Sequence, residues 1–201
     1  MKATDALAKL HALGVPVIST ADAAGVLGET PSAAQKTLSR LADASLVRLV
    51  CRGVWALATV DPLVLPEYLT APQPSYVSLQ TALYQHGMIE QIPAVVYAVS
   101  LGRTRQIRTR LGTFSIHRVA PDVFGGFDVT DAGVKLARPE KALFDVLYLS
   151  ATRDRRFAAL PELELPKKFD RRELRRWTAR ITSPALAKLV SDKLARVLAR
   201  R

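Results

Sequence analysis

Glycine and proline divide the first 60 residues into short segments, and this punctuation most constrains what the chain can fold into. The first segment has apolar residues at helical spacing and ends at Gly14. The second begins at a hydroxyl residue able to cap a helix and ends at Gly28. The third opens with Thr30 as a cap and Pro31 at the first helical position. The pattern therefore predicts three short helices.

The third predicted helix has one apolar face and one polar face. Ala34, Leu38 and Leu41 recur at helical spacing and are expected in the core. The polar residues of the other face are Ser32, Gln35, Lys36, Ser39 and Arg40. Gln and Arg can read base edges in the major groove, while Ser and Lys can contact phosphates. We predict a DNA-recognition helix; the alternative is the solvated face of an ordinary three-helix domain.

Two short runs rich in β-branched and other apolar residues follow the third helix. They span Leu46–Val50 and Val54–Leu57 and are joined by Cys51-Arg52-Gly53, which predicts a hairpin with a basic tip. Three helices followed by a hairpin are the element order of a winged helix-turn-helix. Arg52 would then lie at the tip of the wing, where it could contact phosphate or enter a minor groove. We interpret Cys51 as a small apolar residue beside the wing.

The chain carries 29 Lys and Arg residues against 18 Asp and Glu residues, a formal net charge of +11. Such an excess favours a polyanionic partner, with nucleic acid ahead of an anionic membrane. The net charge is +2 over residues 1–60, zero over residues 61–150 and +9 over residues 151–201. The positive charge is therefore concentrated in the last quarter of the chain.

Proline also marks the predicted domain boundary. Four prolines fall between residues 61 and 74 in a stretch without periodicity. Because proline removes a backbone donor and fixes φ, this composition is typical of a connector. We predict a winged helix-turn-helix DNA-binding domain over residues 1–60, a proline-rich connector over 61–74, and a mixed α/β domain with a helical basic tail over 75–201. The predicted fold class is α+β.

The second predicted domain begins with a helix and continues as β-rich sequence. Ser78 can cap a helix that ends at Gly87, and three β-rich runs follow between residues 92 and 119. No acidic residue lies between Glu90 and Asp122, but five arginines do: Arg103, Arg105, Arg108, Arg110 and Arg118. We expect them to concentrate positive potential and contact phosphate. In a regular strand the first two would face one side and the next two the other, so a single patch requires a twist or a bulge.

The basic tail is predicted to form two helices. Asp170 and Glu173 have the spacing of a capping box, and the expected buried stripe is Leu174, Trp177 and Ile181. Three arginines at i+4 spacing repel one another unless an anion is near, so we predict phosphate contacts for Arg172, Arg176 and Arg180. In the second helix the residues expected on the core side are Leu186, Leu189, Val190, Leu194, Val197 and Leu198.

Segments spread along the chain together resemble the AbiEi antitoxin family, the transcription-regulating partners in type IV toxin–antitoxin systems. They are Tyr76-Val77-Ser78-Leu79 with Ala82-Leu83 and His86-Gly87, the run Val134–Asp145, and the winged helix that precedes them. The resemblance implies an autorepressor that binds double-stranded DNA at inverted repeats in its own promoter. It also implies a C-terminal antitoxin domain that counteracts a nucleotidyltransferase toxin without a stable complex.

Other functions compete with this one. Asp131, Glu140, Lys141 and Asp145 could form a metal-dependent nuclease centre. However, Glu140 and Lys141 diverge at a helix start, and Lys141 with Asp145 has the spacing of an ordinary surface ion pair. The remaining alternatives are an RNA-binding module that uses the basic tail and a winged-helix repressor unrelated to a toxin. We expect no enzymatic activity, no cofactor and no metal site.

Composition also bears on location. The single cysteine cannot form an intrachain disulfide, and no Cys/His cluster has zinc-ligand spacing. The longest apolar run, Ile92–Leu101, is far shorter than a membrane span. We therefore expect a cytoplasmic protein that does not associate with membranes.

Overall fold

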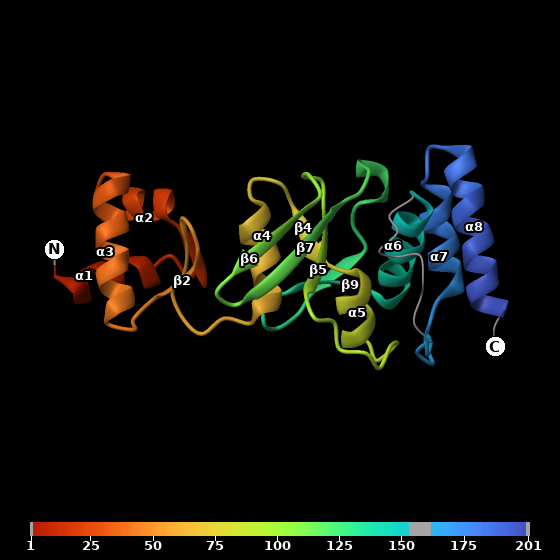
Figure 1. The fold of residues 1–201 in the computed structure, drawn as a ribbon, viewed down its shortest axis with the longest axis horizontal. Helices are drawn as coiled ribbons and strands as arrows, with labels where there is room; N and C mark the ends of the chain where they lie inside the picture. Colours follow the sequence, from red (N-terminus) through yellow and green to blue (C-terminus); the bar gives the residue numbers. More distant parts are fainter. Residues whose placement is uncertain (1, 153–161, 200–201) are drawn as a thin grey trace.

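The computed structural model describes residues 2–152 and 162–199. These residues form eight α-helices, two 3-10 helices and nine strands in two sheets, which confirms the α+β class. The molecule is elongated, with the N-terminal helices at one end, a six-stranded sheet in the middle and the last two helices at the other end (Figure 1). Part of the predicted basic tail, residues 153–161, lies outside the described residues.

Residues 2–60, the N-terminal unit, contain three helices and a small antiparallel sheet. The helices are α1 (Ala3–His11), α2 (Thr20–Leu27) and α3 (Pro31–Asp43). The sheet has the order β1-β3-β2, with β1 (Val17–Ser19), β2 (Arg48–Cys51) and β3 (Val54–Ala56). The three helices and the hairpin lie close to the predicted segments. Strand β1 was not expected, because three residues are too few to show a period.

Hydroxyl caps begin α2 and α3, as the sequence predicts. Ser19 Oγ accepts a hydrogen bond from the Asp22 N–H at 3.0 Å, and Thr30 Oγ1 accepts one from the Ala33 N–H at 3.3 Å. Each side chain thereby satisfies a backbone donor that has no partner within its helix. The caps fix the residues at which α2 and α3 begin.

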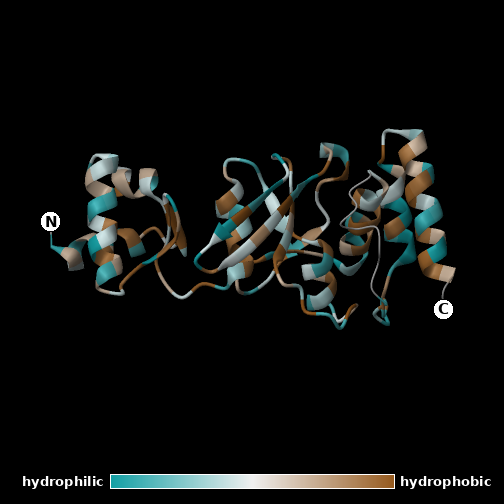
Figure 2. Ribbon diagram, in the orientation of Figure 1, coloured by the Kyte–Doolittle hydropathy of each residue, from teal (hydrophilic) through white to brown (hydrophobic). Residues whose placement is uncertain are grey.

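The two faces of the small sheet pack against different layers. Successive strand residues point to opposite faces, so Trp55 packs among the three helices while Ala56 and Val50 pack toward the central part. Val50 joins a cluster with Phe114, and its carbonyl accepts the Arg110 N–H at 2.9 Å. We call this cluster the junction; its buried members are Val17, Val50, Ala56, Leu65, Leu69, Ala98, Phe114 and Ile116. The small sheet is strongly hydrophobic in Figure 2, as burial on both faces requires.

The span predicted as a proline-rich connector is folded into two short helices that the sequence did not predict. It contains η1 (Pro62–Val64) and α4 (Leu65–Thr70). Leu65 is fully buried and Leu69 nearly so, and both belong to the junction. Pro62 and Pro66 sit in the first turns of their helices, where a missing N–H leaves no hydrogen bond unmade. The sequence suggested a connector because a six-residue helix is too short to show periodicity.

The central sheet has six strands in the order β6-β7-β5-β4-β9-β8. The strands are β4 (Ser75–Val77), β5 (Val96–Ser100), β6 (Arg105–Thr109), β7 (Gly112–Arg118), β8 (Phe127–Val129) and β9 (Lys135–Ala137). The β5–β7 and β4–β9 pairs are parallel and the others antiparallel. The β6–β7 pairing has no register shift, so the bulge that a single arginine patch would require is absent from it.

Helices cover the face of the central sheet that points away from the junction. Ala98 of β5 belongs to the junction, whereas its neighbour Val99 packs against the opposite layer. That layer contains α5 (Leu79–Gln85) and α6 (Pro139–Ala151). The short helix η2 (Pro121–Val123) lies between β7 and β8. Helix α6 is buried on nearly every side because it lies between the sheet and the last two helices.

The C-terminal pair, α7 (Arg171–Ala179) and α8 (Pro184–Ala199), packs on α6. The stripe predicted for α7 is confirmed: Leu174, Trp177 and Ile181 are buried. For α8 one expectation is wrong, because Leu189 is 51% exposed while Val190 and Leu194 are buried. Adjacent helical positions differ by about 100°, so the side that buries Val190 turns Leu189 toward solvent.

Candidate nucleic-acid interface

The exposed face of α3 contains the residues predicted to read DNA. Ser32, Gln35, Lys36 and Arg40 are exposed and Ser39 is half-buried. Ala34 and Leu38 on the other side of the helix are completely buried. The helix therefore presents a continuous polar face whose position is set by an apolar core. An α-helix of this kind has the dimensions to enter a major groove.

Hydrogen bonds hold Gln35 in place from below. Thr20 Oγ1 donates to Gln35 Oε1 at 3.1 Å, and Trp55 Nε1 donates to Thr20 Oγ1 at 3.0 Å. This relay joins β3, α2 and α3. Because the amide oxygen is engaged, the NH₂ group of Gln35 is the part that remains to donate hydrogen bonds to a ligand.

Arg40 is held in a similar way. Its Nη2 donates to Thr37 Oγ1 at 3.3 Å, and the Thr37 hydroxyl donates to the Glu29 carboxylate at 3.1 Å. One guanidinium nitrogen is thus engaged, while the side chain as a whole stays exposed. A guanidinium positioned this way keeps donors for a base edge or a phosphate and loses less entropy on binding.

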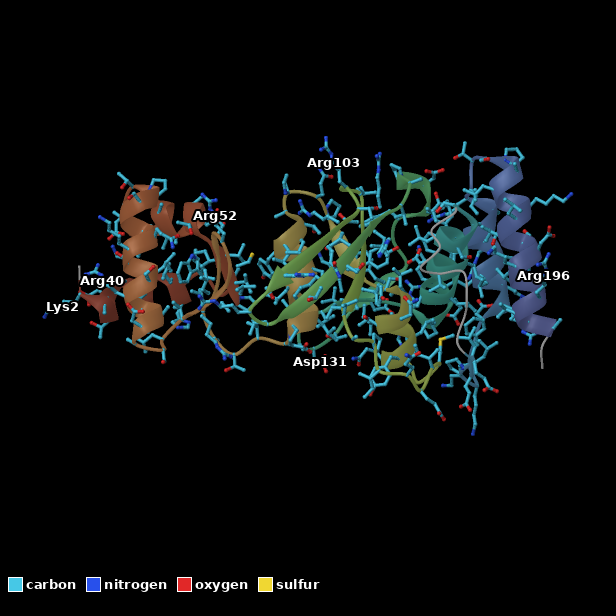
Figure 3. The ribbon with its side chains drawn as sticks, in the orientation of Figure 1. Lys2, Arg40, Arg52, Arg103, Asp131 and Arg196 are labelled. Atoms are coloured by element: carbon cyan, nitrogen blue, oxygen red, sulfur yellow. The ribbon has the colours of Figure 1, made fainter. Side chains whose placement is uncertain are left out.

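The hairpin between β2 and β3 has Arg52 and Gly53 at its tip. Gly53 has φ of 79°, a conformation that favours glycine, and its carbonyl accepts the Thr20 N–H at 2.9 Å. Arg52 is exposed there as predicted. In Figure 3 it lies on the side of the N-terminal unit nearer the central sheet, whereas Arg40 lies on the outer side of α3. Burial raises the pKa of the neighbouring Cys51 thiol, which fits an unreactive apolar role.

The five arginines between Glu90 and Asp122 fall into separate places. Arg103, Arg105 and Arg118 line a hollow beside the loop that follows α4. Arg110 lies in the β6–β7 turn, where its backbone contacts β2. Arg108 is exposed, with its side chain on the face of β6 opposite Arg105, since it lies three residues further along a regular strand. The structure therefore brings three of the five together, not all of them.

The arginine stripe of α7 is exposed but partly engaged within the protein. Arg176 Nη2 lies 3.3 Å from Asp170 Oδ2, and the Arg180 guanidinium lies 4.5 Å from the centre of the Trp177 ring. No such side-chain partner accompanies Arg172 within the described residues. Repulsion between the arginines is thus relieved in part by an internal carboxylate and an aromatic face. The stripe lies at the opposite end of the molecule from α3 (Figure 1).

The predicted capping box of α7 is formed differently. The Asp170 carboxylate accepts the Arg172 N–H at 2.7 Å, so its capping role is confirmed. The Asp170 N–H, however, donates to Glu140 of α6 at 2.7 Å. Glu173 instead accepts from Arg138 at 3.2 Å. The sequence could not show this, because Glu140 is 30 positions away along the chain.

Lys141 and Asp145 are not the surface ion pair that their spacing predicted. Both side chains are fully buried, with Lys141 Nζ donating to Asp145 Oδ1. The Tyr76 and Ser78 hydroxyls donate to Asp145 Oδ2 at 3.1 and 2.7 Å. Ser78 therefore stands at the N-cap position of α5 as predicted, but its hydroxyl makes no capping hydrogen bond. Burial raises the pKa of Asp145 and lowers that of Lys141, and their mutual attraction opposes both changes.

Aromatic rings enclose the buried ammonium group. Lys141 Nζ lies 4.8 Å from the ring centres of Phe144 and Trp177 and 5.5 Å from that of Tyr76. A Cβ at Gly126 would lie 2.5 Å from the Trp177 ring and 3.0 Å from Lys141 Cγ, so no side chain fits there. Burial also raises the pKa of Tyr76 well above its usual range. The apolar residues that follow Lys141 in α6, Ala142–Phe144 and Val146–Leu149, were the one signal that could have indicated its burial.

The residues considered for a nuclease centre do not meet. Asp131 is exposed between β8 and β9 (Figure 3), whereas Asp145 is enclosed and Glu140 bonds the backbone of Asp170. Over residues 2–152 and 162–199, no three His, Cys, Asp or Glu side chains are grouped so that they could hold a metal ion.

None of the helices in these residues is both long and apolar enough to cross a membrane. No protein-family model and no curated protein matches the chain.

Proposed function

We propose that the protein binds double-stranded DNA, with α3 as the recognition helix of a winged helix-turn-helix and the β2–β3 hairpin as its wing. The observation that carries this proposal is the exposed face of α3. There Gln35, Lys36 and Arg40 lie opposite a fully buried stripe, and hydrogen bonds from α2 and from within α3 hold two of them. A preorganised polar face on a capped helix supports base contacts in a major groove.

The roles within this interface follow from the chemistry of each side chain. The Gln35 amide NH₂ donates to an acceptor on a base edge, and the free guanidinium nitrogens of Arg40 donate to guanine or phosphate. Lys36 supplies a point charge for a phosphate. Arg52 on the hairpin contacts the DNA backbone outside the groove that α3 occupies.

The test is a binding measurement on the full chain with DNA from upstream of its gene and with random DNA of equal length. Gln35→Ala or Arg40→Ala should weaken binding to the upstream DNA by about 1–3 kcal/mol and to random DNA much less. Arg48→Ala, which removes an exposed charge on β2, is the matched control and should change both affinities alike. Equal losses on both DNAs for the α3 variants would show phosphate contact only.

The resemblance to the AbiEi family extends the proposal to autorepression and to neutralisation of a nucleotidyltransferase toxin. Coexpression with the product of the adjacent downstream gene tests this part. We expect that product to stop growth alone and growth to recover with the full chain, without a complex that survives copurification. A harmless downstream product would contradict the antitoxin role and leave DNA binding as a separate question. Competition between upstream DNA and RNA distinguishes the RNA-binding alternative.

A further inference from the structure

A hollow at one end of strands β5, β6 and β7 gathers three arginines from different segments. Its walls are residues 70–73, from the end of α4 onward, and residues 100–103, from the end of β5 onward, together with Arg105 and Arg118. We call it the arginine hollow. Its volume is about 430 Å³, within the size range of small-molecule sites. Figure 3 shows Arg103 projecting outward from the central part of the molecule.

The arginine hollow is positively charged without a compensating carboxylate. Apart from its three arginines it is lined by neutral residues. Within the described ranges, no carboxylate oxygen lies within ion-pair distance of Arg103, Arg105 or Arg118. The arginines of α7 differ in this respect, since Arg176 has a partner in Asp170. Three guanidinium groups around one concave space repel one another unless an anion occupies it.

Hydrogen bonds fix the walls of the hollow before any ligand arrives. Arg105 Nη2 donates to the Leu69 carbonyl near the end of α4 at 2.7 Å, which anchors one guanidinium and leaves its other donors free. The Arg118 N–H donates to Thr104 Oγ1 at 2.9 Å, and the Gly102 N–H donates to Ser100 Oγ at 3.0 Å. The turn after β5 is therefore held against β7, which fixes the backbone that carries Arg103 and Arg118.

The turn is also in close contact with the opposite wall. A Cβ at Gly102 would lie 3.3 Å from the Gln73 Cβ. Ser100 Oγ donates to the Pro74 carbonyl at 2.8 Å, which ties the same two walls together. This part of the hollow is therefore a fixed feature of the fold and not a chance gap between mobile side chains.

We propose that the arginine hollow binds a free oligophosphate, such as pyrophosphate or the phosphate chain of a nucleoside triphosphate. Guanidinium forks match phosphate oxygens two at a time, and several of them around one space suit an anion with multiple charges on adjacent groups. A duplex presents a convex surface with phosphates spread along it, so it fits a concave hollow poorly. The proposal goes beyond DNA binding by α3 and does not depend on it.

The experiment is calorimetric titration of the full chain with pyrophosphate, and separately with a nucleoside triphosphate, at two salt concentrations. Arg103→Gln and Arg118→Gln should each weaken binding about tenfold or more, the usual size for loss of a charge-assisted hydrogen bond. Arg108→Gln is the matched control, because it removes an exposed charge from β6 that does not line the hollow. Its affinity should equal that of the unchanged chain.

Thermal melting supplies a second readout for variants whose folding is in question. Pyrophosphate should raise the melting temperature of the unchanged chain and of Arg108→Gln but not of Arg118→Gln. No binding of either oligophosphate, or equal binding by all three variants, overturns the proposal. If oligophosphates fail to bind while Arg118→Gln weakens binding to DNA, the hollow belongs to a nucleic-acid surface and the proposal is wrong. If Arg118→Gln loses pyrophosphate binding while its affinity for DNA is unchanged, the proposal is supported.

Discussion

At the scale of single residues, the buried pair of Lys141 and Asp145 is the feature with the largest expected energetic effect. Removing one partner leaves the other charge buried without compensation, which costs about 3–5 kcal/mol in comparable pairs. We expect Asp145→Leu to lower the free energy of unfolding by about that amount, because Lys141 is then enclosed only by aromatic rings. Urea unfolding at neutral pH measures the change.

The double variant is the control for this prediction. Lys141→Met with Asp145→Leu removes both charges, so its loss of stability should be smaller than the sum of the two single losses. The Tyr76 and Ser78 hydroxyls lose their acceptor in either case. Additive losses would mean that the two charges do not stabilise one another.

Gly126 offers a second prediction at this scale. Gly126→Ala should destabilise the fold by about 1–3 kcal/mol more than Gly133→Ala, because the new Cβ would overlap Trp177. Gly133 is a matched control: its φ of 78° is close to the 75° of Gly126, but nothing lies within 4 Å of its Cβ position. Backbone strain is therefore similar in both variants. Equal melting temperatures would show that the Trp177 ring can move aside at little cost.

At the scale of elements, the small sheet serves two cores. Val17 and Val50 lie on its junction face, so a fragment of residues 1–60 would expose both. We expect this fragment to bind a hydrophobic dye and self-associate, and Val17→Thr with Val50→Thr to reduce both effects. In the full chain the same two changes should lower the free energy of unfolding by about 2–4 kcal/mol, because each buries a hydroxyl. Dye fluorescence, sedimentation and urea unfolding measure these outcomes.

The same two substitutions should reduce dye binding and self-association of the fragment but destabilise the full chain. This contrast makes the prediction specific. A monomeric fragment that binds no dye would show that the junction face is not exposed by the truncation. The junction also means that DNA binding by residues 1–60 alone is not a clean measure of α3.

At the scale of the whole molecule, α3 and the arginine stripe of α7 lie toward opposite ends of the long axis (Figure 1). If both bind one duplex, Arg172→Gln, Arg176→Gln and Arg180→Gln together should reduce the salt dependence of binding. The log–log slope should fall by about 0.9 for each phosphate that the variant no longer neutralises, and only on duplexes long enough to reach α7. Binding to short and long duplexes at several salt concentrations measures this.

The stability of the triple variant needs measuring alongside. Arg176 contributes an exposed ion pair and Arg180 packs on the Trp177 ring, so about 1 kcal/mol of stability should be lost, well short of unfolding. Unchanged slopes on both duplex lengths would identify the stripe as a solvated surface.

The sequence by itself determined the local structure of this protein. The signals that could be read from the chain act through neighbours a few residues away. They are Thr30 with Pro31, the glycine after α2 and the two β-rich runs of the hairpin. The apolar stripe of α3 likewise left its polar face exposed. The choice of Gln35, Lys36 and Arg40 as the candidate interface followed from that pattern alone.

Only the tertiary structure decided how distant segments combine. It buried Lys141 with Asp145 and moved the hydroxyl of Ser78 from a cap to a carboxylate 67 positions away. It also divided the arginines of β6 and its neighbours among a hollow, the opposite face of β6 and a turn. Spacing along one helix shows which side chains can meet, but burial depends on what packs against that helix. That information resides in contacts between elements, which a single sequence does not display.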